Sequence, residues 1–204
     1  MTTDDLSLPD GWRFVDLTAN YRSAHRLFER NIPGLFSKID SPDAGIEKGR
    51  RGWYLDGDPR SLEIWAGVKD TAGTLVAAAH VAPAWGYLDH FSIMPLATRP
   101  DSEWTTQFLR EARTVQEFAV ASEYRSRGIG QLLERHVAAR AHANGCTYLH
   151  GFTSESADAR AFFHSCGYTL MPENTGLPVP VMIGMPMKHD NSISGPGWWF
   201  YRKL

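Results

Sequence analysis

The segment TVQEFAVASEYRSRGIGQLL, from Thr114 to Leu133, constrains the fold more than any other part of the chain. Its first seven residues are rich in β-branched and apolar side chains, which is typical of a strand. Gly128 and Gly130 then precede apolar residues at helical spacing, which end at Asn144-Gly145. A strand followed by a basic turn and a glycine-rich helix start predicts an anion site. The first helical turn has unpaired backbone N–H groups, and the helix dipole favours negative charge there.

Composition excludes several classes of protein. A chain of 204 residues suits one domain, and its net charge of −2 provides no basic field for nucleic acid. No run of about 18 apolar residues is present that could cross a membrane. The opening MTTDDLSLPDG is acidic, unlike a signal or transit peptide, and Cys146 and Cys166 suit reduced thiols. We therefore expect a cytoplasmic protein.

Helix and strand patterns alternate along the rest of the chain. Strands are expected at GWRFVDLT and in a hairpin, SLEIWAGVKD with TLVAAAHVA, and a helix at NYRSAHRLFERNI. A short helix ends near Ala112, and later segments predict a strand at CTYLHGF, a helix at ESADARAFFHSC, and strands at YTLMP and GWWFYRKL. This order predicts an α/β fold of the mixed α+β kind, with one domain over residues 1–204. Proline and glycine predict a long loop at about 173–196.

Two common phosphate-binding motifs do not fit the turn. A dinucleotide fingerprint needs a third glycine, where this chain has Leu133. A P-loop needs Gly-Lys-Ser/Thr, and no such run follows. Arg125 and Arg127 still add charge for phosphoryl oxygens. The alternative for the two glycines alone is a solvated basic turn, but the strand before them and the amphipathic helix after them favour an anion site.

The turn resembles the signature of the Gcn5-related N-acetyltransferases (GNAT), which is Gln/Arg-x-x-Gly-x-Gly/Ala at the end of a central strand. Here it reads Arg125-Ser126-Arg127-Gly128-Ile129-Gly130. SADARAFFHSCGY resembles the family's later helix and strand, with Gly167 and Tyr168 as the final pair. The resemblance covers about residues 60–172. It implies a central mixed, mostly antiparallel sheet, splayed between the fourth and fifth strands and flanked by helices, with acetyl-CoA in the gap.

The resemblance also implies the cofactor contacts. The N–H groups from Arg127 to Gln131 would hold the pyrophosphate, and the backbone of Phe118 and Val120 would pair with the pantetheine arm. One of the latter N–H groups would polarise the thioester carbonyl. Ser156 stands where the family often has Asn, and Phe163 where many members have a catalytic Tyr. The acetyl-CoA contacts predicted in this way are Phe118, Ala119, Val120, Arg125, Ser126, Arg127, Gly128, Ile129, Gly130, Gln131, Ser156 and Phe163.

The implied reaction is direct acetyl transfer to an amine. A lysine-like amine has a pKa of about 10.4, so it is mostly protonated at neutral pH, and a base helps. Glu117 is the only carboxylate in TVQEFAV, and we expect Glu117 and Gln116 to hold the water that accepts the proton. Strand alternation puts the two on opposite faces unless a bulge re-aims one of them. The alternative for Glu117 is a structural pair with a neighbouring cation.

The acceptor is expected to enter opposite the cofactor. RGWYLDGD and WGYLDHF combine aromatic and acidic residues, which suits a cationic amine with an apolar body. We expect a small-molecule primary amine as the partner, with no nucleic acid and no membrane, and a homodimer stays open. No HExxH or CxxC is present, so no metal is expected. The alternative functions are a CoA-binding sensor or interaction domain with weak or no transferase activity, and an acetyltransferase for protein N-termini or lysines.

Overall fold

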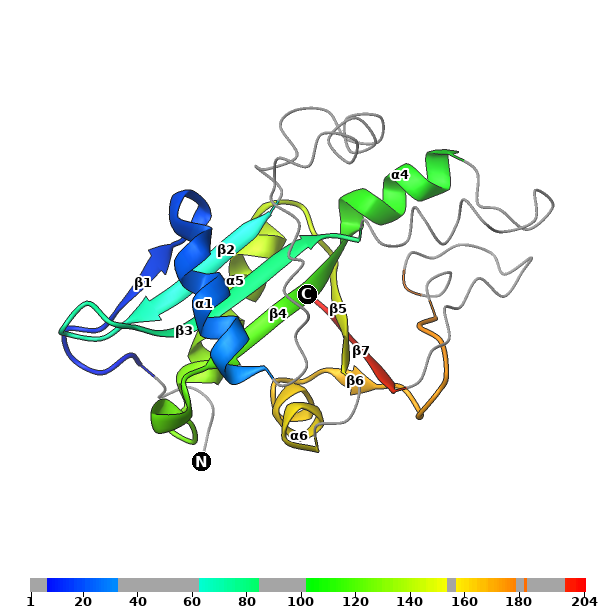
Figure 1. Ribbon diagram of the computed structural model, residues 1–204. Helices are drawn as coiled ribbons and strands as arrows, with labels where there is room; N and C mark the ends of the chain where they lie inside the picture. The colour runs from blue at the N-terminus through cyan, green and yellow to red at the C-terminus, as the bar shows by residue number, and fades with distance from the viewer. Residues whose placement is uncertain (1–6, 33–62, 85–101, 154–156, 179–181, 183–196) are drawn as a thin grey trace.

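The computed structural model describes residues 7–32, 63–84, 102–153, 157–178, 182 and 197–204 (Figure 1). Strands and helices alternate through these residues in the order expected from the sequence. They are β1 (Arg13–Asp16), η2 (Thr18–Asn20), α1 (Tyr21–Asn31), β2 (Ile64–Lys69), β3 (Leu75–Pro83), α4 (Ser102–Glu111), β4 (Ala112–Val120), η4 (Ser122–Tyr124), α5 (Ile129–Ala143), β5 (Tyr148–Thr153), α6 (Ala157–Ser165), β6 (Thr169–Leu170) and β7 (Trp198–Lys203).

The strands form one seven-stranded sheet in the order β1-β2-β3-β4-β5-β7-β6. Neighbouring strands are antiparallel except for β4 and β5, which run parallel. This arrangement confirms the mixed, mostly antiparallel sheet predicted from the sequence. No helix among the described residues is long and apolar enough to span a membrane.

The parallel pairing of β4 and β5 is short. It runs from Ala112 opposite Tyr148 to Val115 opposite Gly151 and then ends. Beyond that point β4 continues beside β3, while β5 continues beside β7. The two strands therefore separate along the second half of β4, as the predicted splay between the fourth and fifth strands requires.

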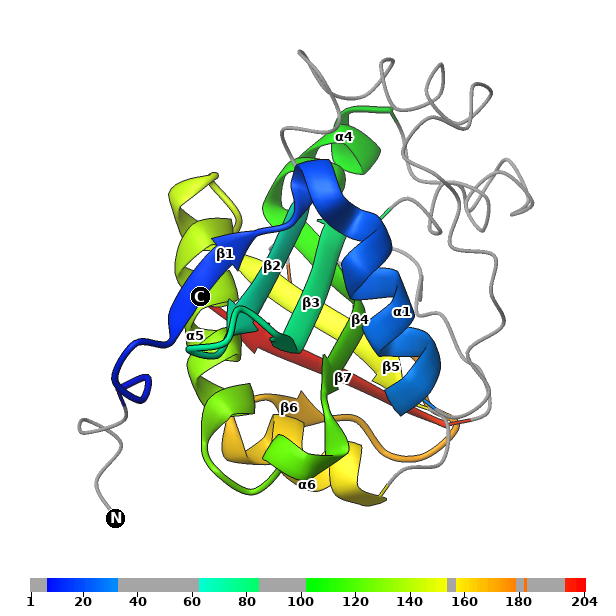
Figure 2. The same ribbon diagram turned by 60° about the vertical axis from the view of Figure 1, so that its left-hand side comes forward.

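Helices cover both faces of the sheet, with α1 on one face and α5 on the other (Figures 1 and 2). Side chains alternate along β4 between these two faces. Val115 and Phe118 pack in the core on the α5 side, together with Ile129 at the start of that helix. Ala119 packs in the core under α1, together with Trp65 of β2. The position of a residue along β4 therefore decides whether its side chain packs on the α5 face or under α1.

A buried polar network anchors the last strand to α5. The Tyr168 hydroxyl donates to Glu134 Oε1 at 3.0 Å. Arg202 Nη1 lies 3.0 Å from both carboxylate oxygens of Glu134 and donates to them. The Glu134 side chain is only 3% exposed, so its two partners provide the hydrogen bonds that water cannot. This network holds β7 against the helix that follows the glycine-rich turn.

Candidate active site

The turn between β4 and α5 has the backbone of an anion site. Ser126 and Gly128 have left-handed φ angles of 59° and 77°. Gly128 is the N-cap of α5, and no side chain of the described residues caps it. The N–H of Leu132 donates to the Gly128 carbonyl at 3.0 Å, and this is the first i→i−4 bond of the helix. The N–H groups of Ile129, Gly130 and Gln131 therefore precede the helical bonds, where an anion is favoured.

The two glycines of the turn are needed for different physical reasons. Gly128 takes a positive φ, which glycine adopts without steric cost. A Cβ on Gly130 would lie 3.0 Å from Phe162 Cε2 and 3.3 Å from Val120 Cγ2. A side chain at position 130 would therefore press against both α6 and the end of β4. The Gly-x-Gly spacing combines one conformational and one packing requirement.

The two arginines of the turn have different surroundings. The Arg125 Nε–H donates to the Val120 carbonyl at 3.1 Å, and Nη2 donates to the Asn31 carbonyl at 3.3 Å. Arg125 thus ties the turn to the ends of β4 and α1. Arg127 is exposed, with its guanidinium carbon 5.5 Å from the centre of the Tyr124 ring. Arg127 is the better placed of the two to add charge for a phosphate.

The backbone of β4 faces the gap at two predicted positions. The Ala121 N–H donates to the Val76 carbonyl at 2.9 Å, so residue 121 is turned toward β3. Backbone groups alternate along an antiparallel pair, and those of Phe118 and Val120 are therefore turned away from β3. The pairing of β4 with β5 has already ended there. The N–H groups of Phe118 and Val120 and the Phe118 carbonyl can consequently bond to an extended chain lying in the gap, while the Val120 carbonyl accepts from Arg125.

A β-bulge interrupts β4 beside the gap. His80 is opposite Glu117, whereas Val81 is opposite Val115, so Gln116 is an extra residue on β4. The Gln116 side chain is exposed, and that of Glu117 is 11% exposed. The sequence analysis allowed for a bulge that would re-aim Glu117 or Gln116, and the structure contains a bulge at Gln116. It sets the register in which Glu117 meets β3.

Glu117 belongs to a buried polar cluster that the sequence analysis did not identify. His80 Nδ1 lies 2.8 Å from Glu117 Oε2, and His80 Nε2 lies 3.5 Å from Glu63 Oε2. Trp65 stacks on the His80 ring with centroids 3.7 Å apart, and its Nε1–H donates to Glu63 Oε2 at 3.2 Å. The available sequence signal was one histidine within the apolar run LVAAAHVAP of β3.

The charge of His80 follows from these neighbours. Burial lowers the pKa of His80, but the hydrogen bonds and charges of Glu117 and Glu63 outweigh burial, so the pKa is raised above its ordinary value. The partner of Glu117 is therefore a histidine that favours its protonated form. His80 therefore stands where the sequence analysis allowed for a neighbouring cation paired with Glu117.

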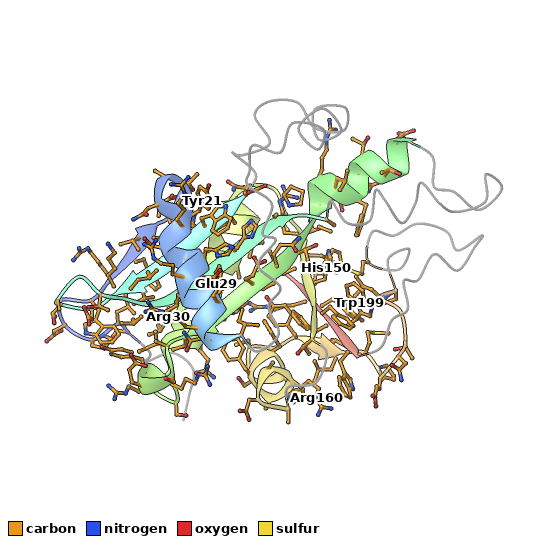
Figure 3. All side chains as sticks on the ribbon, viewed as in Figure 1. Tyr21, Glu29, Arg30, His150, Arg160 and Trp199 are labelled. Carbon is orange, nitrogen blue, oxygen red and sulfur yellow. The ribbon has the colours of Figure 1, made fainter. Side chains whose placement is uncertain are left out.

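A second histidine lies on β5, opposite Thr114 in the part where β4 and β5 are still paired. His150 Nε2 lies 3.2 Å from Thr114 Oγ1. His150 is fully buried, and burial lowers its pKa to about 3, so the ring is neutral near neutral pH. Figure 3 shows His150 of β5 beside Trp199 of β7, with ring centroids 6.5 Å apart. The pKa values of the two histidines beside β4 are therefore shifted in opposite directions.

Phe163 is a core residue. Its side chain is 6% exposed and stacks on Phe200 with centroids 3.8 Å apart. Its contact with the cofactor stays a prediction. Ser156, the segments RGWYLDGD and WGYLDHF, and most of the 173–196 loop lie outside the described residues. Among the residues that are described, no group of three His, Cys, Asp or Glu side chains could hold a metal ion.

Comparisons with known proteins agree with this geometry. Residues 21–168 match the family model described as the acetyltransferase (GNAT) family. A GNAT family acetyltransferase from Elizabethkingia anophelis with acetyl-CoA bound is 14% identical, with a TM-score of 0.53 over 96% of this chain and 100% of that one. A GNAT superfamily phosphinothricin acetyltransferase from Sinorhizobium meliloti in complex with acetyl-CoA is 14% identical, with a TM-score of 0.55 over 95% and 89%. No curated protein sequence matches the chain significantly. At these identities the solved structures show a shared fold.

Proposed function

The chain belongs to the GNAT family of acetyltransferases, and on this premise we propose that it transfers the acetyl group of acetyl-CoA directly to the primary amine of a small molecule. One observation carries the proposal. The pairing of β4 with β5 ends at Val115, immediately before Gln116, Glu117 and the gap-facing backbone of Phe118. A thioester in that gap and a carboxylate beside it are the two requirements of acyl transfer to an amine.

The binding of acetyl-CoA divides between the turn and the strand. The N–H groups from Arg127 to Gln131 hold the pyrophosphate, because they precede the first helical bond of α5. The pantetheine arm pairs with the backbone of Phe118 and Val120 as an added strand. One N–H of this pair donates to the thioester carbonyl oxygen and stabilises the negative charge that develops on it. Acetyl-CoA bound to relatives of the same fold supports this assignment.

The amine is deprotonated on the side of Glu117. Its N–H bond breaks, and the proton passes to Glu117 through a water that Gln116 also holds. The amine nitrogen then attacks the thioester carbonyl carbon, the C–S bond breaks, and the CoA thiolate leaves. The nitrogen gives up its second proton to solvent, which leaves a neutral amide. A thiol pKa of about 8.5 makes thiolate a tolerable leaving group near neutral pH, so Phe163 need not donate a proton.

The thiols of the chain favour direct transfer over an acyl-enzyme. Burial raises the pKa of Cys146 to about 11 and that of Cys166 to about 12. Both cysteines are free, but neither forms the thiolate that attacks a thioester near neutral pH. The amine itself is therefore the nucleophile that we propose.

A panel of candidate acceptor amines tests this proposal. Release of free thiol from acetyl-CoA is followed with small primary amines, with peptides that have free N-termini, and with lysine peptides whose N-termini are blocked. We expect release that depends on a small amine and an acetylated product in equal amount. Release with peptides alone would instead identify a protein acetyltransferase. CoA binding without release for any acceptor would identify a sensor and overturn the proposal.

A further inference from the structure

We propose that Glu63, His80 and Glu117 act as one unit, in which His80 bridges the two carboxylates and fixes Glu117 for the amine proton. His80 and Glu63 are positioning residues in this account, because they reach the substrate only through Glu117. The proposal rests on the function proposed above and adds to it the groups that control the base. The three residues come from separate segments: Glu63 directly precedes β2, His80 is on β3 and Glu117 is on β4.

Both nitrogens of the His80 ring face a carboxylate, and the contact at Nδ1 has the geometry of a hydrogen bond while that at Nε2 is within ion-pair distance only. Nδ1 lies 2.8 Å from Glu117 Oε2 and Nε2 lies 3.5 Å from Glu63 Oε2. A neutral imidazole has one N–H, so only the protonated ring can donate toward both carboxylates. The side chains of His80, Glu63 and Glu117 are 10%, 5% and 11% exposed, so water contributes little. The raised pKa of His80 agrees with a protonated ring.

Contacts around the cluster keep it in one arrangement. The indole of Trp65 lies parallel to the His80 ring, with an interplanar angle of 13°, and also donates to Glu63. Tyr21 of α1 lies beside the same indole in a tilted arrangement, with ring centroids 5.7 Å apart. Burying three ionisable groups is costly unless they are paired. A cluster built at this cost beside the gap is more readily explained by chemistry than by stability.

Among the described residues, the two carboxylates of the cluster are the groups that raise the pKa of His80. From the segment before β2 and from β4, the charged groups facing His80 are Glu63 and Glu117, and these are the two that raise its pKa. The helix packed over this face, α1, presents apolar Ala24, Leu27 and Phe28 to the sheet. Two carboxylates and one imidazolium leave one net negative charge, which favours an incoming ammonium group.

The protons on His80 and Glu117 can be followed through the reaction. At rest the cluster holds one proton, on His80. Deprotonation of the amine breaks one N–H bond and adds a second proton, which Glu117 receives through the bound water while His80 keeps its own. The second proton returns to solvent when the product leaves. If His80 loses its proton, a ring that keeps its Nδ1–H still donates to Glu117, but the bond is no longer assisted by a positive charge and Glu117 is held less firmly.

The test compares two Glu-to-Gln variants. Glu63→Gln removes the far carboxylate of the cluster without touching Glu117. Glu29→Gln is the matched control, because Glu29 pairs with His25 at 3.2 Å on α1 but is 43% exposed. The protonation midpoint of His80 is followed by NMR of its ring nuclei. In parallel, kcat/KM for the best amine in the panel is measured from pH 5 to pH 9.

We expect the wild-type midpoint of His80 to lie above the ordinary histidine value of about 6.5. Glu63→Gln should lower that midpoint and shift a transition in the kcat/KM profile by the same amount, whereas Glu29→Gln should move neither. His80→Gln should reduce kcat at least tenfold and leave the KM for acetyl-CoA unchanged. If Glu63→Gln does not fold, Glu63→Asp keeps the charge, moves it away from His80, and should shift both quantities in the same direction.

Three results would overturn the inference. A protonation midpoint of wild-type His80 at or below the ordinary histidine value would show that His80 does not bridge the two carboxylates as a protonated ring. A midpoint that moves in Glu63→Gln while the kcat/KM profile stays in place would make the cluster structural and leave the proposed function standing. Absence of transfer to every amine by the wild type would remove the proposed function itself, and this inference with it.

Discussion

His80 and Glu117 meet across the pair β3–β4 with Nδ1 and Oε2 2.8 Å apart, at the β-bulge formed by Gln116. The bulge lies one residue beyond Val115, where β4 loses its partner β5. The same short stretch of strand therefore opens the gap that we propose for the thioester and positions the carboxylate that we propose as the base. The predictions below separate these two contributions.

Replacing Glu117 tests the base. Glu117→Gln keeps the size of the side chain but cannot accept a proton. A general base contributes roughly 10²- to 10⁴-fold, so kcat/KM at pH 7 should fall at least tenfold. The loss should be smaller at pH 9, where more of the amine is already neutral. Steady-state rates of amine-dependent thiol release at the two pH values measure the effect.

Asp10→Asn is the control for this exchange, because Asp10 is an exposed carboxylate in the turn before β1. Its kcat/KM should equal that of the wild type at both pH values. Wild-type activity of Glu117→Gln at pH 7 and pH 9 would show that Glu117 is structural and that solvent or another acid accepts the proton.

The anion turn is tested by two glycines at the two ends of α5. Gly128 precedes the helix with φ 77°, and Gly145 follows it with φ 79°. Alanine is strained at either position, so both variants should lose roughly 1 kcal/mol of stability in urea unfolding. Calorimetry should show weaker CoA binding for Gly128→Ala alone. Equal CoA affinity in the two variants would show that the turn is not part of the cofactor site.

Gly130→Val should act on affinity and stability together. A side chain at this position meets Phe162 and Val120, so it displaces the helix start and the end of β4 at once. CoA affinity should fall more than tenfold, which corresponds to about 1.4 kcal/mol. Isothermal calorimetry on folded protein measures this, and an unchanged dissociation constant would contradict the assignment.

The turn could be predicted from sequence because local patterns carry it, whereas the splay was predicted only as what the resemblance to the GNAT family implies. The strand TVQEFAV, the glycines at 128 and 130 and the apolar stripe of α5 are contiguous, and the structure contains each of them. The bond between His80 and Glu117 joins residues 37 apart and depends on the register of β3 against β4. Period-two alternation gives the face of a residue but not its partner across a bulge.

The side chain of Arg125 shows the same limit. Its charge and its place in the motif predict a phosphate contact, which stays a prediction, and its Nη2 also bonds to the carbonyl of Asn31, which is 94 residues away. Nothing in a linear pattern states which helix end lies beside a turn. Residue type and spacing therefore predicted the kind of site, while contacts between distant segments decided which groups are engaged in it.

Acid stability should depend on His150. Its folded-state pKa of about 3 lies below the unfolded value of about 6.5, so between these values the unfolded chain binds a proton that the folded chain does not. The contribution of the neutral His150 to the free energy of unfolding is present above about pH 6.5 and is lost as the pH falls toward 3. From pH 7 to pH 5 the wild type should therefore lose about 2 kcal/mol more than His150→Leu in urea unfolding. His164→Gln, at an exposed position of α6, should lose as much as the wild type.

Phe163→Tyr tests whether position 163 supplies a proton to the leaving thiolate. The ring packs among Phe200, Tyr168 and Phe118, so an added hydroxyl enters an aromatic cluster. We expect a lower unfolding temperature and no increase in kcat. Phe152→Tyr adds the same hydroxyl to a ring that is 40% exposed and should leave the unfolding temperature unchanged. A kcat above that of the wild type for Phe163→Tyr would show that the thiolate does need an acid there.

Direct transfer is tested most sharply by following a labelled acetyl group through one turnover. The protein is mixed with a substoichiometric amount of acetyl-CoA labelled in the acetyl carbonyl and with the best amine of the panel. The reaction is quenched at intervals, and mass spectrometry locates the label. We predict that the label passes from the thioester to the amine with equal release of CoA and never appears on the protein. Label found on a side chain during turnover, or label that stays on the thioester with every amine, would contradict direct acetyl transfer at this site.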